Sequence, residues 1–178
     1  MKIAITTLGC KINQYDSAVI QNRLEGKHSF VPFEDMADCY VINTCTVTDR
    51  ADWQARQLVR RAKRLNPGAK VLVTGCYAQV SADEVAGIDG VDYVVGLNRL
   101  DDLLRFVESA PPARTEIAVS DVQRERGVPV IGTRALPGHT RAFLKIQEGC
   151  NYSCTYCIIP TARGLSRSVA PREILQQV

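Results

Sequence analysis

The stretch from Cys39 to Cys76, CYVINTCTVTDRADWQARQLVRRAKRLNPGAKVLVTGC, contains one complete strand–helix–strand unit. Two short β-branched runs, Cys39–Asn43 and Val71–Thr74, have the composition of strands. Between them, the spacing of apolar residues predicts a helix over Asp52–Leu65, which the Asn-Pro-Gly sequence at 66–68 brings to an end. Because strands joined by a crossover helix normally pair in parallel, this stretch predicts an α/β fold.

The same alternation continues on both sides of this unit. Strands are predicted at Lys2–Thr6 and Tyr93–Val95, and helices at Ser17–Leu24, Ala82–Ala86 and Leu100–Glu108. This order implies a parallel sheet with helices on both faces, as in flavodoxin-like or Rossmann-like domains. We therefore expect an α/β domain over residues 1–112.

A different pattern begins after the Pro-Pro pair at 111–112. Residues 113–140 are rich in Pro, Gly and Arg, and we interpret them as an edge strand, Glu116–Val119, followed by a linker. Beyond the linker, Ala142–Gln147 has strand character and Pro171–Val178 begins like a helix. Residues 141–178 are thus expected to open a second domain, most of whose body is not in this chain.

Composition narrows the class of protein. The 178 residues are 46% apolar and carry a net charge of +3, which suits a globular chain and neither requires nor excludes a nucleic-acid partner. No segment approaches the roughly 20 apolar residues of a membrane span, so we expect a cytoplasmic protein without a membrane partner. Seven cysteines cannot all pair within the chain, and in a reducing compartment they indicate metal or redox chemistry.

Three cysteines follow the first three predicted strands. Cys10, Cys45 and Cys76 are separated by 35 and 31 residues, close to the length of one strand–helix–strand unit. Since parallel strands end on the same edge of a sheet, these thiols are expected to meet there, with glycines before Cys10 and Cys76 allowing tight turns. The alternative is that they are three buried small side chains. Cys39, at the start of a strand, is assigned to the core.

A second cysteine triplet lies close together in sequence. Cys150, Cys154 and Cys157 form a C-x3-C-x2-C run, which places three thiolates within one loop, as in iron–sulfur proteins. Structural zinc normally takes four ligands, and no histidine lies near this run. Three protein ligands leave one iron of a four-iron cluster open, so each triplet predicts a cluster that binds a ligand.

The second triplet also carries a family resemblance. The run at 149–160, GCNYSCTYCIIP, followed by Arg163-Gly164, resembles the signature of the radical S-adenosylmethionine superfamily and its methylthiotransferase branch. The runs TLGCKINQYDS at 7–17, NTC at 43–45 and TGC at 74–76 are similar to the same enzymes.

The resemblance implies a set of cofactors. It implies an auxiliary 4Fe-4S cluster on the first triplet, a second 4Fe-4S cluster that binds S-adenosyl-L-methionine on the second triplet, and Tyr156 beside the adenine. It also implies that residues 141–178 begin a partial (β/α) barrel. Asn13, one helical turn beyond Cys10, is expected in the shell of the first cluster, although it could equally begin a helix.

The resemblance implies a reaction as well. The wording LGCKINQ at 8–14 and KIQEGC at 145–150 is most similar to enzymes that add a methylthio group at C2 of N6-threonylcarbamoyladenosine in tRNA, with an electron donor such as flavodoxin or ferredoxin. This chain alone is expected to be inactive. The alternatives are the isopentenyladenosine tRNA enzyme, the ribosomal-protein enzyme, and a non-catalytic metal-binding α/β module.

Arginines recur at four-residue intervals along the central predicted helix. Arg56, Arg60 and Arg64 fall on one helix face, which could contact RNA phosphates or could simply be a solvated surface.

Overall fold

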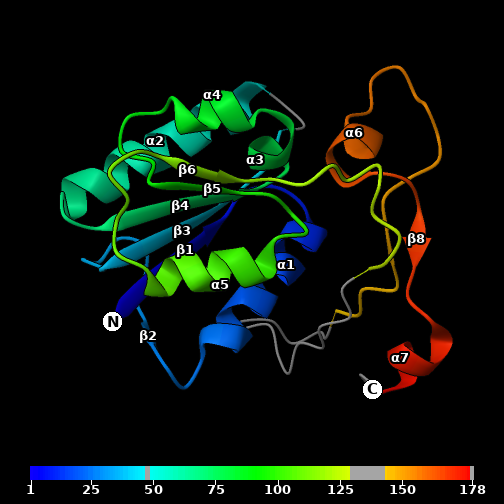
Figure 1. Ribbon diagram of the computed structural model, residues 1–178, viewed down its shortest axis with the longest axis horizontal. Helices are drawn as coiled ribbons and strands as arrows, with labels where there is room; N and C mark the ends of the chain where they lie inside the picture. The colour runs from blue at the N-terminus through cyan, green and yellow to red at the C-terminus, as the bar shows by residue number, and fades with distance from the viewer. Residues whose placement is uncertain (47–48, 129–142, 177–178) are drawn as a thin grey trace.

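The computed structural model describes residues 1–46, 49–128 and 143–176 (Figure 1). Its centre is a six-stranded sheet in the order β2-β1-β3-β4-β5-β6, in which every neighbouring pair is parallel. The predicted α/β class with a parallel sheet is confirmed. The strands are β1 (Lys2–Thr7), β2 (Ser29–Phe30), β3 (Cys39–Thr44), β4 (Lys70–Gly75), β5 (Tyr93–Val95) and β6 (Glu116–Ala118).

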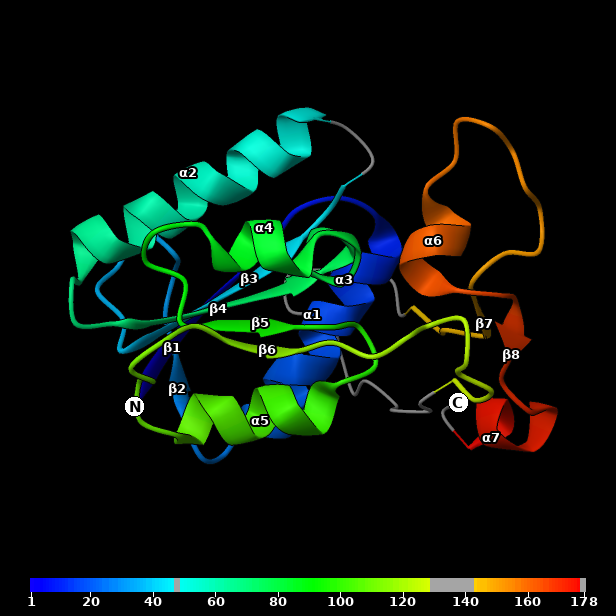
Figure 2. The same ribbon diagram turned by 45° about the horizontal axis from the view of Figure 1, so that its top comes forward.

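Helices cover both faces of the sheet, as predicted (Figure 2). One face carries α2 (Asp49–Leu65), α3 (Cys76–Val80) and α4 (Ala82–Ala86), and the other carries α1 (Lys11–Leu24) and α5 (Leu100–Glu108). Alternate residues of β3 point into the two apolar layers: Tyr40 and Ile42 into the first, Cys39 and Val41 into the second. The core position predicted for Cys39 is confirmed, since its side chain is fully buried.

Over residues 1–112 the sequence did not predict two elements and began two helices late, one of them α2, which begins at Asp49 rather than Asp52. The edge strand β2 and the short helix α3 were not predicted, and α1 begins at Lys11 rather than Ser17. The first turns of α1 bury Asn13 and Tyr15 against the segment that follows residue 142, not against the sheet core alone. A polar surface buried in this way has no apolar period to reveal the helix.

The expected strand over Ala142–Gln147 is wrong over residues 143–146, and only Gln147 lies in a strand. Residues 143–146 form no strand, and Ala142 itself lies outside the described residues. Lys145 instead turns toward Asp16 of α1, 3.1 Å away, so this stretch packs on a helix. The short strand β7 (Gln147–Glu148) pairs antiparallel with β8 (Arg167–Ser168).

Two short helices complete the segment. An unpredicted helix, α6 (Ile159–Arg163), packs against α3, and α7 (Pro171–Leu175) begins at Pro171 as predicted. The last two residues of the predicted helix, 177–178, lie outside the described residues. Across residues 1–46, 49–128 and 143–176 there is no barrel, and no helix is long and apolar enough to cross a membrane.

Candidate metal centre

The three strand-end cysteines lie at one edge of the sheet. Cys10 directly precedes α1, Cys45 directly follows β3, and Cys76 is the first residue of α3. Because β1, β3 and β4 are neighbours and Thr44 is in register with Gly75, Cys45 and Cys76 leave the sheet side by side. The convergence expected from sequence is therefore what the topology produces.

The side chain of Asn13 lies among these thiols. Its Oδ1 is 3.6 Å from Sγ of Cys10 and 4.0 Å from Sγ of Cys76. Its Nδ2 donates hydrogen bonds to the carbonyl oxygens of Leu8 (3.0 Å) and Thr44 (2.9 Å). Those two donor bonds leave Oδ1 facing the sulfur atoms, and the whole residue is inaccessible to solvent.

Two glycines allow the backbone to approach this closely. Gly75 has φ +97° and ψ −168°, a region essentially restricted to glycine, and a Cβ there would lie 2.2 Å from the Thr44 carbonyl oxygen. Gly9 has φ +99°, and a Cβ there would lie 2.9 Å from Sγ of Cys45. The tight turns predicted before Cys10 and Cys76 are present.

Buried hydrogen bonds from Asn43 and Thr44, the two residues before Cys45, connect β3 to α1 and to β4. Asn43 Nδ2 donates to the carbonyl of Asn13 (2.8 Å) and to Oγ of Ser17 (2.9 Å), and Thr44 donates to the Thr74 carbonyl. Asn43 and Thr44 are the last two residues of β3, which is one residue longer than the predicted strand Cys39–Asn43. Their side chains therefore join neighbouring strands and α1 rather than capping a turn.

Three thiols form the donor set of this site, and sulfur ligands match the chemistry of an iron–sulfur cluster. Among the described residues, no group of three or more His, Cys, Asp or Glu side chains is arranged to hold one metal ion. Burial raises the pKa of the Cys76 thiol, and metal binding would favour the thiolate instead.

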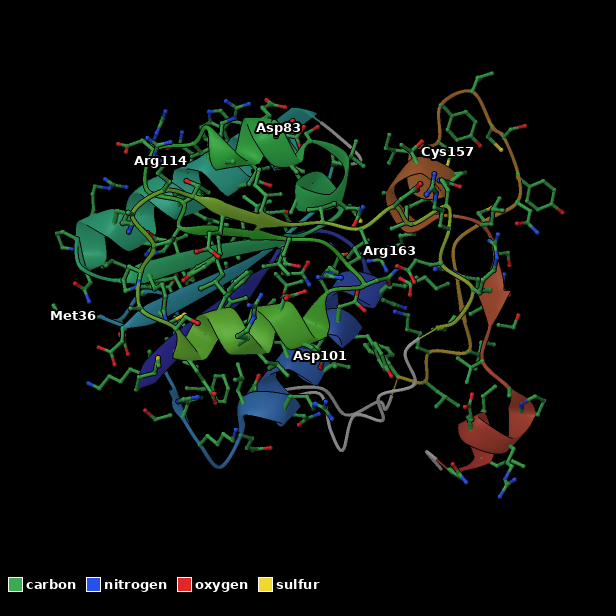
Figure 3. The ribbon with its side chains drawn as sticks, in the orientation of Figure 1. Met36, Asp83, Asp101, Arg114, Cys157 and Arg163 are labelled. Carbon is green, nitrogen blue, oxygen red and sulfur yellow. The ribbon has the colours of Figure 1, made fainter. Side chains whose placement is uncertain are left out.

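Arg163 belongs to the motif that follows the second triplet, but the sequence does not predict where its side chain lies. Its side chain is buried and reaches the first cysteine site from α6: one terminal nitrogen donates to Asn13 Oδ1 (2.8 Å) and to Asp16 (3.0 Å). The other donates to Glu148. Figure 3 shows Arg163 at the end of α6 that faces the sheet. Nothing local in the sequence signals a contact that spans 150 residues.

Lys145 completes a network of two acids and two bases. Its Nζ lies 3.1 Å from Asp16 and 2.8 Å from Glu148, so each acid is shared by Lys145 and Arg163. Although burial opposes it, Asp16, Cys76 and Glu148 raise the pKa of Arg163, which is therefore charged. The network joins α1 to β7 and α6, the elements on either side of the second triplet.

A pocket opens beside this network. Its wall includes Asn43, Thr74 and Gly96 at the ends of β3, β4 and β5, together with Lys145 and Glu148. Open α/β sheets bind ligands at this edge. The rest of the pocket wall is largely apolar and includes Val19 and Ile20 of α1 and Leu103 of α5.

The second triplet lies on a loop between β7 and α6. Cys150 and Cys157 are half-buried and Cys154 is exposed. Gly149 has φ +79°, and the Cys150 amide donates to the Gly164 carbonyl at 3.1 Å, which fixes the base of the loop. Figure 3 shows Cys157 beside α6. Tyr156, expected beside an adenine, is 89% exposed, and its role stays a prediction.

The three arginines at four-residue intervals along α2 have different surroundings. Arg56 donates to the Tyr77 hydroxyl at 3.0 Å and pairs with Glu84 of α4, so it joins three helices. Arg60 and Arg64 are exposed. A continuous row of three free cations is therefore not present.

Comparison with known proteins agrees with this geometry. Residues 2–96, which hold β1 through β5 and all three strand-end cysteines, match the family described as uncharacterized protein family UPF0004. The chain belongs to this family. The match ends before the second triplet, so family membership rests on the sheet domain.

Similar proteins include named enzymes. The chain is 47% identical over its whole length to threonylcarbamoyladenosine tRNA methylthiotransferase MtaB of Aquifex aeolicus (strain VF5), covering 44% of that protein. It is 46% identical, over 98% of the chain and 39% of the relative, to the protein of the same name from Bacillus subtilis (strain 168). It is 32% identical to a tRNA-2-methylthio-N(6)-dimethylallyladenosine synthase of Syntrophus aciditrophicus (strain SB), over 99% of the chain and 39% of that protein. The chain therefore spans less than half the length of these relatives.

Proposed function

We propose that this chain is the cluster-binding part of a tRNA methylthiotransferase. Cys10, Cys45 and Cys76 would hold one 4Fe-4S cluster, and the loop from Cys150 to Cys157 would hold a second that binds S-adenosyl-L-methionine. The observation that carries the proposal is the meeting of three strand-end cysteines at one edge of the sheet, where the buried Asn13 lies within 4.0 Å of Cys10 and Cys76, and Cys45 packs on Gly9. Incidental cysteines would not need to meet at one edge beside Gly9 and Gly75, whose positive φ and close packing favour glycine.

When bound, the two clusters and S-adenosyl-L-methionine would supply the sulfur and radical chemistry of methylthio transfer. The protein's own contribution is placement. Gly9 and Gly75 bring the thiols together, Asn13 turns an amide oxygen toward them, and the network around Arg163 holds the second-triplet segment against α1. Fixed groups of this kind position reactants without reorganising during the reaction.

The proposed substrate is N6-threonylcarbamoyladenosine in tRNA, methylthiolated at C2. Support comes from the higher identity to the two proteins named for that nucleoside, 47% and 46%, than to the dimethylallyladenosine synthase, 32%. Reduction of the clusters would require an electron donor such as flavodoxin or ferredoxin.

Metal content tests the cluster assignment. The chain is reconstituted anaerobically with iron and sulfide, and about eight irons per chain are expected, falling to about four when Cys150, Cys154 and Cys157 are all replaced by Ala. Replacing Cys10, Cys45 and Cys76 should also leave about four. Cys39→Ala is the matched control and should retain all of them, because Cys39 lies in the core. Zinc alone, or no iron, would contradict the proposal.

Nucleoside analysis tests the substrate. Deleting the encoding gene should abolish 2-methylthio-N6-threonylcarbamoyladenosine in tRNA hydrolysates and leave N6-threonylcarbamoyladenosine, measured by mass spectrometry. Restoring the gene with Cys39→Ala should recover the product, whereas Cys76→Ala should not. Loss of a methylthiolated dimethylallyladenosine instead would assign the other substrate.

A further inference from the structure

The first cysteine site contains a cation that arrives from the other part of the chain. Arg163 is the last residue of α6, six positions after Cys157, yet its guanidinium is buried beside Asn13. The same amide oxygen of Asn13 accepts from Arg163 and faces the thiols of Cys10 and Cys76. One residue, Asn13, therefore links Arg163 to two of the three thiols.

The guanidinium of Arg163 is almost fully enclosed, with its side chain 1% exposed to solvent. The Nε of Arg163 is buried and has no hydrogen-bond partner among the described residues.

Pairing with acids alone does not explain this position. Asp16 and Glu148 are each already paired with Lys145, at 3.1 and 2.8 Å. Arg163 contacts the same two acids, but unlike Lys145 it extends further, to a neutral amide that borders the thiols. Lys145 and Arg163 therefore pair with the same two carboxylates, but Arg163 also contacts Asn13 beside the cysteine site.

We propose that Arg163 is a positioning residue of the first cluster: it fixes the Asn13 amide and keeps a positive charge beside the cluster on Cys10, Cys45 and Cys76. This inference rests on the proposed cluster site. A cluster gains negative charge when it is reduced, and a nearby buried cation stabilises the reduced form. Arg163 thus raises the reduction potential of the first cluster, from a segment that also carries the second triplet.

The test uses the full chain with Cys150→Ala, Cys154→Ala and Cys157→Ala, so that only the first cluster forms. Arg163→Met and Arg163→Lys are introduced on this background, and Lys145→Met is the matched control because it removes a cation from the same two acids without touching Asn13. Each reconstituted protein is titrated with dithionite, and the midpoint potential is read from the electron paramagnetic resonance signal.

The expected result is a lower midpoint potential and an altered signal for Arg163→Met. Arg163→Lys should keep a potential closer to that of the parent, because the charge is retained, and Lys145→Met should shift it less than Arg163→Met. Equal shifts for Arg163→Met and Lys145→Met, or no shift for Arg163→Met, would overturn the role of Arg163. Failure of the parent triple variant to bind iron would instead overturn the proposed cluster site, so the two failures are distinguishable.

Discussion

At the residue scale, Gly75 supplies the backbone conformation on which the cysteine site depends. It has φ +97°, and it is packed so closely on β3 that a Cβ would meet both the backbone of Thr44 and the side chain of Asn43. Cys76 can leave β4 beside Cys45 only because no side chain stands between them. The glycine therefore belongs to the cysteine site as much as the thiol does.

Replacing Gly75 should harm both folding and the site. Gly75→Ala is expected to lower the free energy of unfolding by more than about 3 kcal/mol, since a steric clash adds to the cost of the positive φ. Gly26→Ala is the control: it also has a positive φ, +84°, but its Cβ would meet nothing within 4 Å, so about 1 kcal/mol is expected. Urea unfolding measures both. Equal losses would show that packing at Gly75 is unimportant.

Cys39 makes a separate, pH-dependent contribution to the free energy of unfolding. Burial raises the pKa of its thiol from 9.0 to about 12. Between these values the unfolded chain loses the proton while the folded chain keeps it, so stability is full below about pH 9 and falls as pH rises toward 12. No corresponding loss is expected from Cys39 at acid pH.

The variant Cys39→Ala isolates this effect. The difference in free energy of unfolding between the parent and Cys39→Ala should shrink by about 1 kcal/mol from pH 8 to pH 10, because one pKa unit is worth about 1.4 kcal/mol. Other titrating groups are the same in both proteins and cancel. A difference that stays constant with pH would contradict the burial of an unionised thiol.

At the scale of elements, β4 and α5 are joined by a buried lysine. Lys70, the first residue of β4, is 5% exposed, and its Nζ donates to the carbonyls of Phe106 (3.0 Å), Val107 (2.6 Å) and Ser109 at the end of α5. The Phe106 carbonyl also accepts from the Ser109 amide at 3.3 Å, and the cation complements the negative end of the helix dipole. Burial lowers the pKa of Lys70, because removing the charged ammonium from water costs free energy.

Lys70→Met should therefore be strongly destabilising. Removing the ammonium takes one buried donor from all three carbonyls, and a loss of about 2–3 kcal/mol in unfolding free energy is expected. Lys27→Met is the control near the same helix, because Lys27 pairs with Glu108 at 3.3 Å in solvent and should change stability by less than about 0.5 kcal/mol. Thermal and urea unfolding would both report the contrast. Similar small losses for the two variants would show that α5 needs no cap.

At the scale of the whole molecule, a charge network holds residues 143–176 against the sheet domain. Asp16 of α1 is the sheet domain's acid in this network, and it contacts Lys145 at 3.1 Å and Arg163 at 3.0 Å. Because Asp16 is largely screened from solvent, losing its charge leaves two cations with one acid, Glu148. Docking of the second segment should then weaken.

Hydrogen exchange tests this docking. Asp16→Asn is expected to weaken it by about 2 kcal/mol, roughly 30-fold faster amide exchange in α6, with β3 and β4 unchanged. Asp102→Asn is the control, since among the described residues Asp102 pairs with Arg99 and Arg105 in its own neighbourhood. This substitution also removes one negative charge, but from ion pairs that lie within the sheet domain. Unchanged exchange in α6 after Asp16→Asn would show that other contacts hold the segment.

The sequence by itself determined the parallel α/β sheet and the shared edge where Cys10, Cys45 and Cys76 meet. Both depend on local patterns: apolar runs mark β3 and β4, and a cysteine directly after a strand must lie at its carboxyl end. The helices α4 and α5 were predictable for the same reason, because their apolar spacing falls within one element.

Only the tertiary structure decided what surrounds the thiols. The early start of α1, the edge strand β2 and the antiparallel β7–β8 pair all depend on neighbours that are distant in sequence, so no local period announces them. Arg163 is the strongest example, because its partner Asn13 is 150 residues away. Sequence spacing locates ligands on a known topology, whereas a buried cation reaches them only after two segments have packed together.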